Sequence, residues 1–315
     1  MRPVSPMLQP RSWSIDQNNS GPRSHGRGPR LVAVSQPGCM GSGTWAGVYS
    51  IKDMLKAQDT TGTSVSEALA YVQREAPVEI RSDLGFPIAG YVEAHIEQGP
   101  ILESTGNDIG VVSLIQGMRR YIVEILGEDG HSGTTPHAVR KDAMKAAAAI
   151  VVALDEELSD PADIVRYTVG RFEVYPASPS TIPGRVRFII DLRHPDAETL
   201  VRLEQKIFET CHRESGKRRC KADINNYVAV KPQPLAAKIA ELVSRHASNN
   251  GLKHMNMISG AGHDAMHVAK VAPAGMIFIP CLRGISHNEE ESATPGDIVN
   301  GACVLTDVIV EMASN

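Results

Sequence analysis

The hexapeptide RYIVEI at residues 120–125 decides how the middle of this chain folds. Tyr121, Val123 and Ile125 are apolar at alternate positions, and charged residues occupy positions 120 and 124. A period of two is typical of a β-strand that buries one face. The segment therefore predicts a half-buried strand that begins a new structural unit.

The segments after this strand alternate between helical and extended patterns. They are a helix at 136–158, strands at 164–174 and 185–193, a helix at 196–214 and a strand at 222–230. The second helix carries an apolar stripe with helical spacing, formed by Leu200, Leu203, Ile207 and Cys211. The resulting order, βαββαβ, predicts a ferredoxin-like domain.

Another α/β pattern flanks this domain on both sides. Strands are expected at 90–96, 109–115 and 276–280, and helices at 235–248 and 295–312. Ser64 with Glu67 indicates a capping box at the start of a further helix. In the last helix, an apolar face is predicted for Ile298, Ala302, Leu305, Ile309 and Met312.

The predicted fold class is α/β, with a mixed sheet and helices interrupted by the βαββαβ insertion. Residues 39–115 and 228–315 form the interrupted domain, and residues 116–227 form the insertion. Residues 1–38, which are rich in Arg, Ser and Pro, indicate a disordered tail. An organelle transit peptide has a similar composition and is the alternative for this segment.

Composition excludes several classes of function. The net charge of −4 over 315 residues argues against a nucleic-acid partner. No apolar run approaches the roughly 20 residues of a membrane-spanning helix. The five cysteines lack metal-site spacing, which favours free thiols and a cytoplasmic location.

Two polar clusters follow predicted buried strands and contain candidate metal ligands. In HIEQGP at 95–100, His95 could bind zinc, and Gln98 is free to reach a ligand. In GISHNEEE at 284–291, His287 precedes three carboxylates that suit a cation site. A capped strand end and a solvated acidic loop are the respective structural alternatives.

Two further clusters and one arginine complete the candidate site. His131 lies in GHSGTTP at 130–136, and helix capping explains the neighbouring Thr and Pro residues but not the histidine. His263 lies in GAGHDA at 260–265, where a plain turn into a helix is the alternative. Arg193 suits a substrate carboxylate, although it could also be an exposed edge charge.

Taken in order, six stretches resemble the amidase, hydantoinase/carbamoylase family of the zinc aminoacylase and carboxypeptidase superfamily. They are residues 41–47, 95–100, 131–136, 182–195, 259–265 and 284–291. The resemblance implies hydrolysis of non-peptide C–N bonds in linear amides. It also implies that the βαββαβ insertion is a lid and dimerisation domain, and therefore that the chain forms a homodimer.

The same resemblance implies a role for each candidate residue. His95 and His287 match metal ligands of a family site with two divalent ions, which are zinc or else manganese, nickel or cobalt. His131 matches a lid histidine that stabilises the oxyanion, and His263 a second active-site histidine. The implied substrate contacts are Gln98, Arg193 and Ser180, although the family commonly has Asn at the position of Ser180.

The family's other metal ligands and its general-base glutamate lie in motifs that this sequence does not contain. These motifs are Gly-Ser-His-x-Asp, Gly-Gly-x-x-Asp-Gly and a Glu-Glu pair. We therefore expect the chain to correspond to the family without the N-terminal part of its catalytic domain. Either a real deletion or an incomplete gene model would explain this.

Three readings of function follow. The first is a hydrolase of N-carbamoyl-L-amino acids or a similar ureido acid. The second is an inactive remnant, or a dimerisation partner of a full-length relative. The third is an allantoate amidohydrolase, or a dipeptidase or aminoacylase of the same superfamily.

Overall fold

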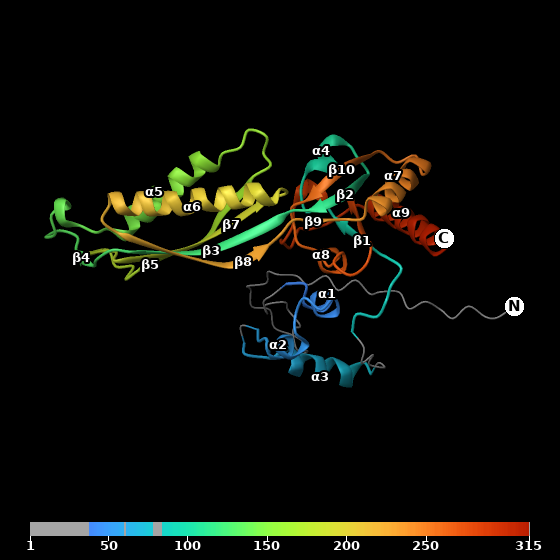
Figure 1. Cartoon of the computed structure of the whole chain (residues 1–315), viewed down its shortest axis with the longest axis horizontal. Coiled ribbons are helices and arrows are strands. Elements are labelled where there is room, and N and C mark those ends of the chain that lie inside the picture. Colours follow the sequence, from blue (N-terminus) through green and yellow to red (C-terminus); the bar gives the residue numbers. More distant parts are fainter. Residues whose placement is uncertain (1–37, 60, 78–83, 315) are drawn as a thin grey trace. The chain divides into compact units, whose positions relative to one another are not determined.

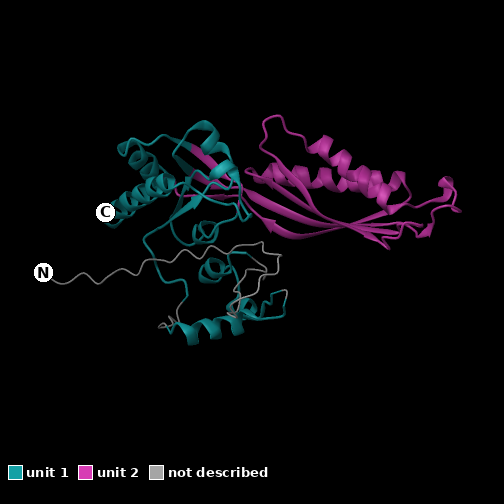
Figure 2. Cartoon of the chain, turned by 180° about the vertical axis from the view of Figure 1, so that it is seen from behind, with its two compact units in different colours: residues 1–111, 238–255, 262–315 teal, residues 112–237, 256–261 magenta. Residues whose placement is uncertain are grey.

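A computed structural model describes residues 38–59, 61–77 and 84–314. The chain divides into two compact units, each built from more than one segment (Figure 1, Figure 2). Unit 1 contains residues 1–111, 238–255 and 262–315, and unit 2 contains 112–237 and 256–261. The tail expected at 1–38 lies outside the described residues, apart from Gly38.

Unit 1 is a mixed α/β structure. Its strands include β1 (Tyr91–Ile96) and β11 (Ala274–Ile279), which pair in parallel. The sheet has the order β1-β11-β2-β10, in which β2 (Ile109–Ile115) and β10 (His254–Ser259) continue into unit 2. The helices of this unit are α1 (Met40–Trp45), α2 (Ile51–Lys56), α3 (Val65–Glu75), α4 (Ile101–Thr105), α7 (Ala237–Asn249), α8 (Ala265–Val268) and α9 (Pro295–Ser314), with a 3-10 turn at Leu282–Gly284.

Helix α3 begins as its sequence predicts. The Ser64 hydroxyl accepts the backbone N–H of Glu67 at 3.2 Å, and the Glu67 carboxylate accepts the N–H of Ser64 at 2.8 Å. Both halves of the capping box are therefore present, and two backbone donors at the start of the helix are satisfied.

Helix α9 buries a different face from the one predicted. Ile298 and Ile309 are exposed, whereas Gly301, Val304 and Val308 are buried. The reason is close packing, because a Cβ on Gly301 would lie 2.5 Å from the Ile279 side chain of β11. The glycine lets the helix approach the strand, and this contact selects the buried face.

Unit 2 has one four-stranded antiparallel sheet and two long helices. The sheet order is β5-β7-β3-β8. Its elements in chain order are β3 (Gly117–Leu126), β4 (Gly130–His131), a 3-10 turn (His137–Val139), α5 (Ala143–Leu158), β5 (Arg166–Tyr175), β6 (Thr181–Ile182), β7 (Arg185–His194), α6 (Ala197–Lys217), β8 (Lys221–Val230) and β9 (Gln233–Pro234). Both helices cover one face of the sheet (Figure 1).

The core of unit 2 follows the sequence periodicity closely. Tyr121, Val123 and Ile125 are fully buried, as their alternation predicts. In α6, Leu200, Ile207 and Cys211 of the predicted stripe are fully buried, and Leu203 packs against them while partly exposed.

Helix α5 and strand β10 differ from the prediction. Helix α5 begins at Ala143 rather than at residue 136, because the Asp142 carboxylate caps it by accepting the N–H of Lys145 at 3.0 Å. Strand β10 is not among the predicted strands. It lies at an end of the sheet order, and its last four residues alternate between exposed and buried. None of the helices in the described ranges is long and apolar enough to cross a membrane.

Candidate active site

Strand β1 directs two candidate ligands to one face of the sheet. Glu93 and His95 are two residues apart, so their side chains project from the same side of the strand. His95 Nδ1 lies 2.8 Å from the carbonyl oxygen of Ile96. A carbonyl can only accept, so Nδ1 carries the proton and the lone pair is on Nε2. In this arrangement the backbone carbonyl fixes the orientation of an imidazole that can bind a metal through its other nitrogen.

His263 packs against His95 although the two are distant in sequence. The ring centroids are 4.7 Å apart and the planes are at 70°. The His263 ring also contacts Phe278 of β11, and the residue is only 3% exposed. Burial, with a smaller contribution from His95, lowers the pKa of His263 to about 3. The imidazole is therefore neutral at physiological pH, as metal coordination requires.

The Glu93 carboxylate completes the cluster. Its Oε1 lies 3.8 Å from Nδ1 of His263, and its Oε2 accepts the N–H of Ala265 at 2.9 Å and the hydroxyl of Tyr91 at 3.2 Å. Burial raises the pKa of Glu93, although the N–H of Ala265 opposes this change. One ligand atom from each of Glu93, His95 and His263 lies within 4.8 Å of the other two.

The cluster fits a divalent cation by the chemistry of its donors. One carboxylate and two imidazoles are ligands that zinc accepts, and catalytic zinc sites commonly have three protein ligands. A bound cation would also offset the cost of burying the Glu93 carboxylate. Glu93 was not among the predicted ligands, although its two-residue spacing from His95 indicates a shared face.

The predicted ligand His287 lies in a second group, which also contains Gln98. The Gln98 amide donates to the Ser286 hydroxyl at 2.9 Å, and its Nε2 is 3.4 Å from Nε2 of His287. Glu291 accepts from the Ser286 hydroxyl at 2.7 Å and from the backbone N–H of His287 at 3.0 Å. Gln98 and His287 both have positive φ, at 59° and 56°. Such backbone strain is maintained only where surrounding contacts fix it, and it often marks a functional site.

Arg193 lies in unit 2 at the end of β7. Its Nε and Nη2 donate to the Asp191 carboxylate at 2.7 and 3.1 Å, and its Nη1 donates to the carbonyl of Gly260 at 2.6 Å. A guanidinium has five N–H donors, so two remain beyond these three hydrogen bonds. Asp191 also accepts from Arg120 on β3 at 2.7 Å. The group is thus held in place with donors left for an anion.

Asp191 should give unit 2 a pH-dependent stability. Burial raises the pKa of Asp191, but the hydrogen bonds and charges of Arg193 and Arg120 outweigh it and leave the pKa below its usual range. The stabilisation is therefore complete above the unfolded-state pKa of about 4 and is lost as pH falls through the lower folded-state value. We expect Asp191→Asn to destabilise unit 2 by about 2 kcal/mol at pH 7.

Hydrogen exchange of β3 and β7 peptides at pH 7, 5 and 3 measures this effect. The difference between Asp191→Asn and the parent should shrink at pH 3, whereas exposed Asp223→Asn should show little difference at any pH. A difference of equal size at pH 3 and pH 7 would contradict the assigned pKa direction.

His131 and Ser180 are brought together by the short pairing of β4 with β6. His131 pairs with Thr181, and the N–H of Ser132 donates to the carbonyl of Ser180 at 2.9 Å. His131 Nδ1 accepts the N–H groups of Gly133 and Thr134, both at 3.1 Å. A neutral ring that accepts at Nδ1 carries its proton on Nε2, which makes the exposed side of His131 a hydrogen-bond donor.

The chain is similar to a known protein family and to several characterised relatives. The family model described as peptidase family M20/M25/M40 matches residues 41–311. Allantoate amidohydrolase of Bacillus subtilis is 33% identical over 87% of this chain and 66% of its own length. N-carbamoyl-L-amino-acid amidohydrolase of Paenarthrobacter aurescens is 33% identical over 86% of this chain and 66% of its own length.

The solved structures agree with the sequence matches. An amidase of the hydantoinase/carbamoylase family from Burkholderia multivorans superposes with a TM-score of 0.81 at 35% identity, covering 90% of this chain and 68% of the other. The chain spans about two thirds of the length of the curated relatives it matches. It belongs to peptidase family M20/M25/M40 and, within it, to the hydantoinase/carbamoylase family.

Proposed function

We propose that this chain carries metal-binding and substrate-binding residues of an amidohydrolase that cleaves a non-peptide C–N bond in a ureido acid. N-carbamoyl-L-amino acids are the preferred substrate class. The observation that carries the proposal is the buried group of Glu93, His95 and His263, whose donor chemistry suits a divalent cation such as zinc. The relatives named for allantoate and for N-carbamoyl-L-amino acids support the reaction class.

When bound, a divalent cation supplies Lewis acidity and stabilises negative charge that develops on the substrate. His95 would bind the cation through Nε2, since its Nδ1 is occupied by the hydrogen bond to the carbonyl of Ile96. His287 is proposed as a ligand because it matches a metal ligand of the family. Its Nε2 lies 3.4 Å from Nε2 of Gln98. Gln98 would hold the substrate by its amide.

We propose substrate-binding and oxyanion-stabilising roles for Arg193, His131 and Ser180 of unit 2 on the basis of their resemblance to family residues. Arg193, oriented by Asp191, has two N–H donors left for a carboxylate, a group that N-carbamoyl amino acids and allantoate share. His131 would donate its Nε2 proton in a hydrogen bond to the developing oxyanion. Ser180 would contribute a further hydrogen bond to the substrate. We also propose that unit 2, whose strand and helix order is that of a ferredoxin-like domain, serves as the lid and dimerisation domain.

Allantoate is the second candidate substrate, because the Bacillus subtilis relative named for it is as similar as the N-carbamoyl-L-amino-acid hydrolase. Allantoate also combines ureido groups with a carboxylate, so the proposed role of Arg193 applies to both. The two candidates differ in the size of the group beside the carboxylate, and competition between them will separate the two assignments.

The test is to measure metal content and hydrolysis on the same purified sample. The chain is incubated with zinc or manganese, desalted and analysed for bound metal. Ammonia release is then measured with an N-carbamoyl-L-amino acid, N-carbamoyl-β-alanine and allantoate, and amino-acid release with a dipeptide. Bound metal with ammonia release from ureido acids supports the proposal. Metal binding without any hydrolysis would instead favour a non-catalytic partner of a full-length relative.

A further inference from the structure

Two arginines of unit 2 share one carboxylate on the face of the sheet opposite the helices. Arg120 on β3 and Arg193 on β7 both donate to Oδ2 of Asp191, at 2.7 and 3.1 Å. Each of these three residues is next in sequence to Tyr121 or Leu192, which are fully buried in the core on the helix side. Successive side chains of a strand point to opposite faces, so the two guanidinium groups lie side by side on the other face.

The Arg120 guanidinium has most of its hydrogen-bond donors unused. Only its Nε takes part in the contact with Asp191, and within the described part of the chain its Nη1 and Nη2 donate no hydrogen bond. Four of its five N–H groups are therefore available to a ligand. The side chain is 30% exposed, so it is partly withdrawn from water and still accessible.

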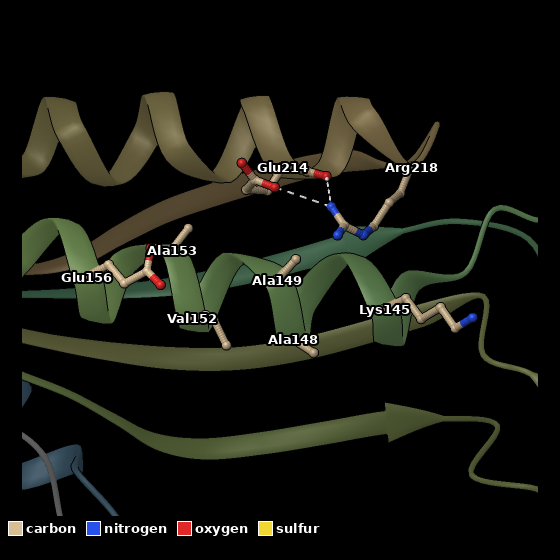
Figure 3. Close-up of a pocket in the computed structure, with 8 residues that line it drawn as sticks. All are labelled: Lys145, Ala148, Ala149, Val152, Ala153, Glu156, Glu214 and Arg218. Atoms are coloured by element: carbon tan, nitrogen blue, oxygen red, sulfur yellow. Dashed lines mark hydrogen bonds and ion pairs between the residues drawn. The ribbon is translucent and has the colours of Figure 1, made fainter.

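A carboxylate shared by several cations does not by itself indicate a ligand site. Glu214 of α6, beside the groove of about 560 Å³ between α5 and α6, pairs with Lys217 at 2.6 Å and Arg218 at 3.2 Å (Figure 3). These cations follow Glu214 by three and four residues, a spacing that brings side chains together on any helix. Arg120 and Asp191 are instead 71 residues apart and meet through the register of β3 with β7. Local helix geometry therefore explains the sharing at Glu214 but not the second guanidinium beside Arg193.

An apolar side chain lies next to both arginines. Met118 is opposite Arg193 in the pairing of β3 with β7 and two residues before Arg120, so it projects from the same face. It is partly buried. A ligand that reaches from one guanidinium to the other could thus place its methylene groups against Met118.

The arrangement suits a ligand with two carboxylates. Carboxylates are the acceptors that match a guanidinium best. Asp191 offsets only one of the two positive charges, so the pair remains cationic and attracts anions. A carboxylate on Arg193 would leave the Arg120 donors unused, and a second carboxylate two or three carbon atoms away would satisfy them. N-carbamoyl derivatives of aspartate and glutamate have this spacing.

We propose that Arg120 recognises a side-chain carboxylate of the substrate and makes this chain selective for N-carbamoyl derivatives of acidic amino acids. The inference rests on the proposed function, in which Arg193 binds the α-carboxylate. It adds a specificity-determining residue, since Arg120 lies outside the six stretches that resemble the family.

The test compares the binding of N-carbamoyl-L-glutamate and N-carbamoyl-L-glutamine, which differ in charge but hardly in shape. Isothermal titration calorimetry of the full chain without added metal measures both affinities. The glutamate derivative should bind at least about tenfold more tightly than the glutamine derivative. In Arg120→Gln this ratio should fall to about threefold or less. Arg120→Lys retains the charge but not the planar donors, so an intermediate ratio is expected. Arg193→Gln should weaken the binding of both ligands.

Arg187→Gln makes the same change at an arginine of the same face of β7 that pairs with Glu124 in the strand register, and it is the matched control. It should keep the parental ratio. Equal affinity of the parent for the two ligands, or an unchanged ratio in both Arg120 variants, would overturn the inference and leave the proposed function standing. Absence of binding by either ligand would overturn the role of Arg193 and the inference together. Ammonia release with added metal is measured separately, so selective binding without hydrolysis would count against the proposed function alone.

Discussion

His95→Ala should weaken zinc binding by at least about 100-fold. His95 belongs both to the buried cluster with Glu93 and His263 and to the ligand set implied by resemblance. Its ring is held by the carbonyl of Ile96, so the protein orients Nε2 before a cation arrives. Removal of this ligand leaves at most two of the three donors in the cluster, too few for a stable catalytic site.

Competition with a chromophoric chelator measures the affinity, and elemental analysis after desalting measures the stoichiometry. His212→Ala removes an exposed histidine of α6 and is the matched control, with parental affinity expected. If His95→Ala retains zinc as well as this control does, the cluster around β1 is not the metal site.

Two further variants separate the two possible ligand sets. Glu93→Gln retains the shape of the side chain but removes its negative charge, and His287→Ala removes a histidine that lies outside the buried cluster. Loss of zinc affinity only in Glu93→Gln would assign the cluster as the site. Loss only in His287→Ala would favour the ligands implied by resemblance, and loss in both would require one site that uses all of them.

Phe188→Ala should destabilise unit 2 by about 3–5 kcal/mol. Phe188 is fully buried on β7, between the sheet and the two helices, and is among the largest side chains of this core. Its ring stacks on Phe172 of β5, with centroids 5.6 Å apart and planes at 15°. Truncation leaves a cavity that close-packed neighbours cannot fill, such as the fully buried Val123, which lies opposite Phe188 on β3.

Phe172→Ala is the matched control, because it removes the same ring from the same stacked pair at a position that is 38% exposed. We expect a smaller loss of about 1–2 kcal/mol. Hydrogen exchange of β3 and β7 peptides reports the opening of unit 2 alone, and urea unfolding gives the order of the variants. Equal losses of stability in the two variants would show that the burial of Phe188 does not make it more important than Phe172.

Much of unit 2 could be predicted from local sequence because its elements are long and regularly patterned. The alternation around Tyr121 identifies a strand and its buried face, and the stripe on α6 identifies a helix and its packing side. Prediction failed for strand β10, where the alternation of apolar and polar residues is weak. Strand β10 lies at an end of the sheet order and contains Met, Asn and Ser, so its sequence resembles a loop.

The sequence by itself indicated the family, singled out the candidate histidines and predicted the strand that carries His95. Only the tertiary structure decided which of these residues meet. His95 and His263 come within 4.7 Å because β1 pairs in parallel with β11 and the segment after β10 returns to the same face, and Glu93 joins them by its position on β1. The buried side of α9 was likewise decided by the contact of Gly301 with Ile279. The spacing of apolar residues shows which face of a helix or strand is apolar. Which element packs against that face depends on contacts between segments that are distant in the chain.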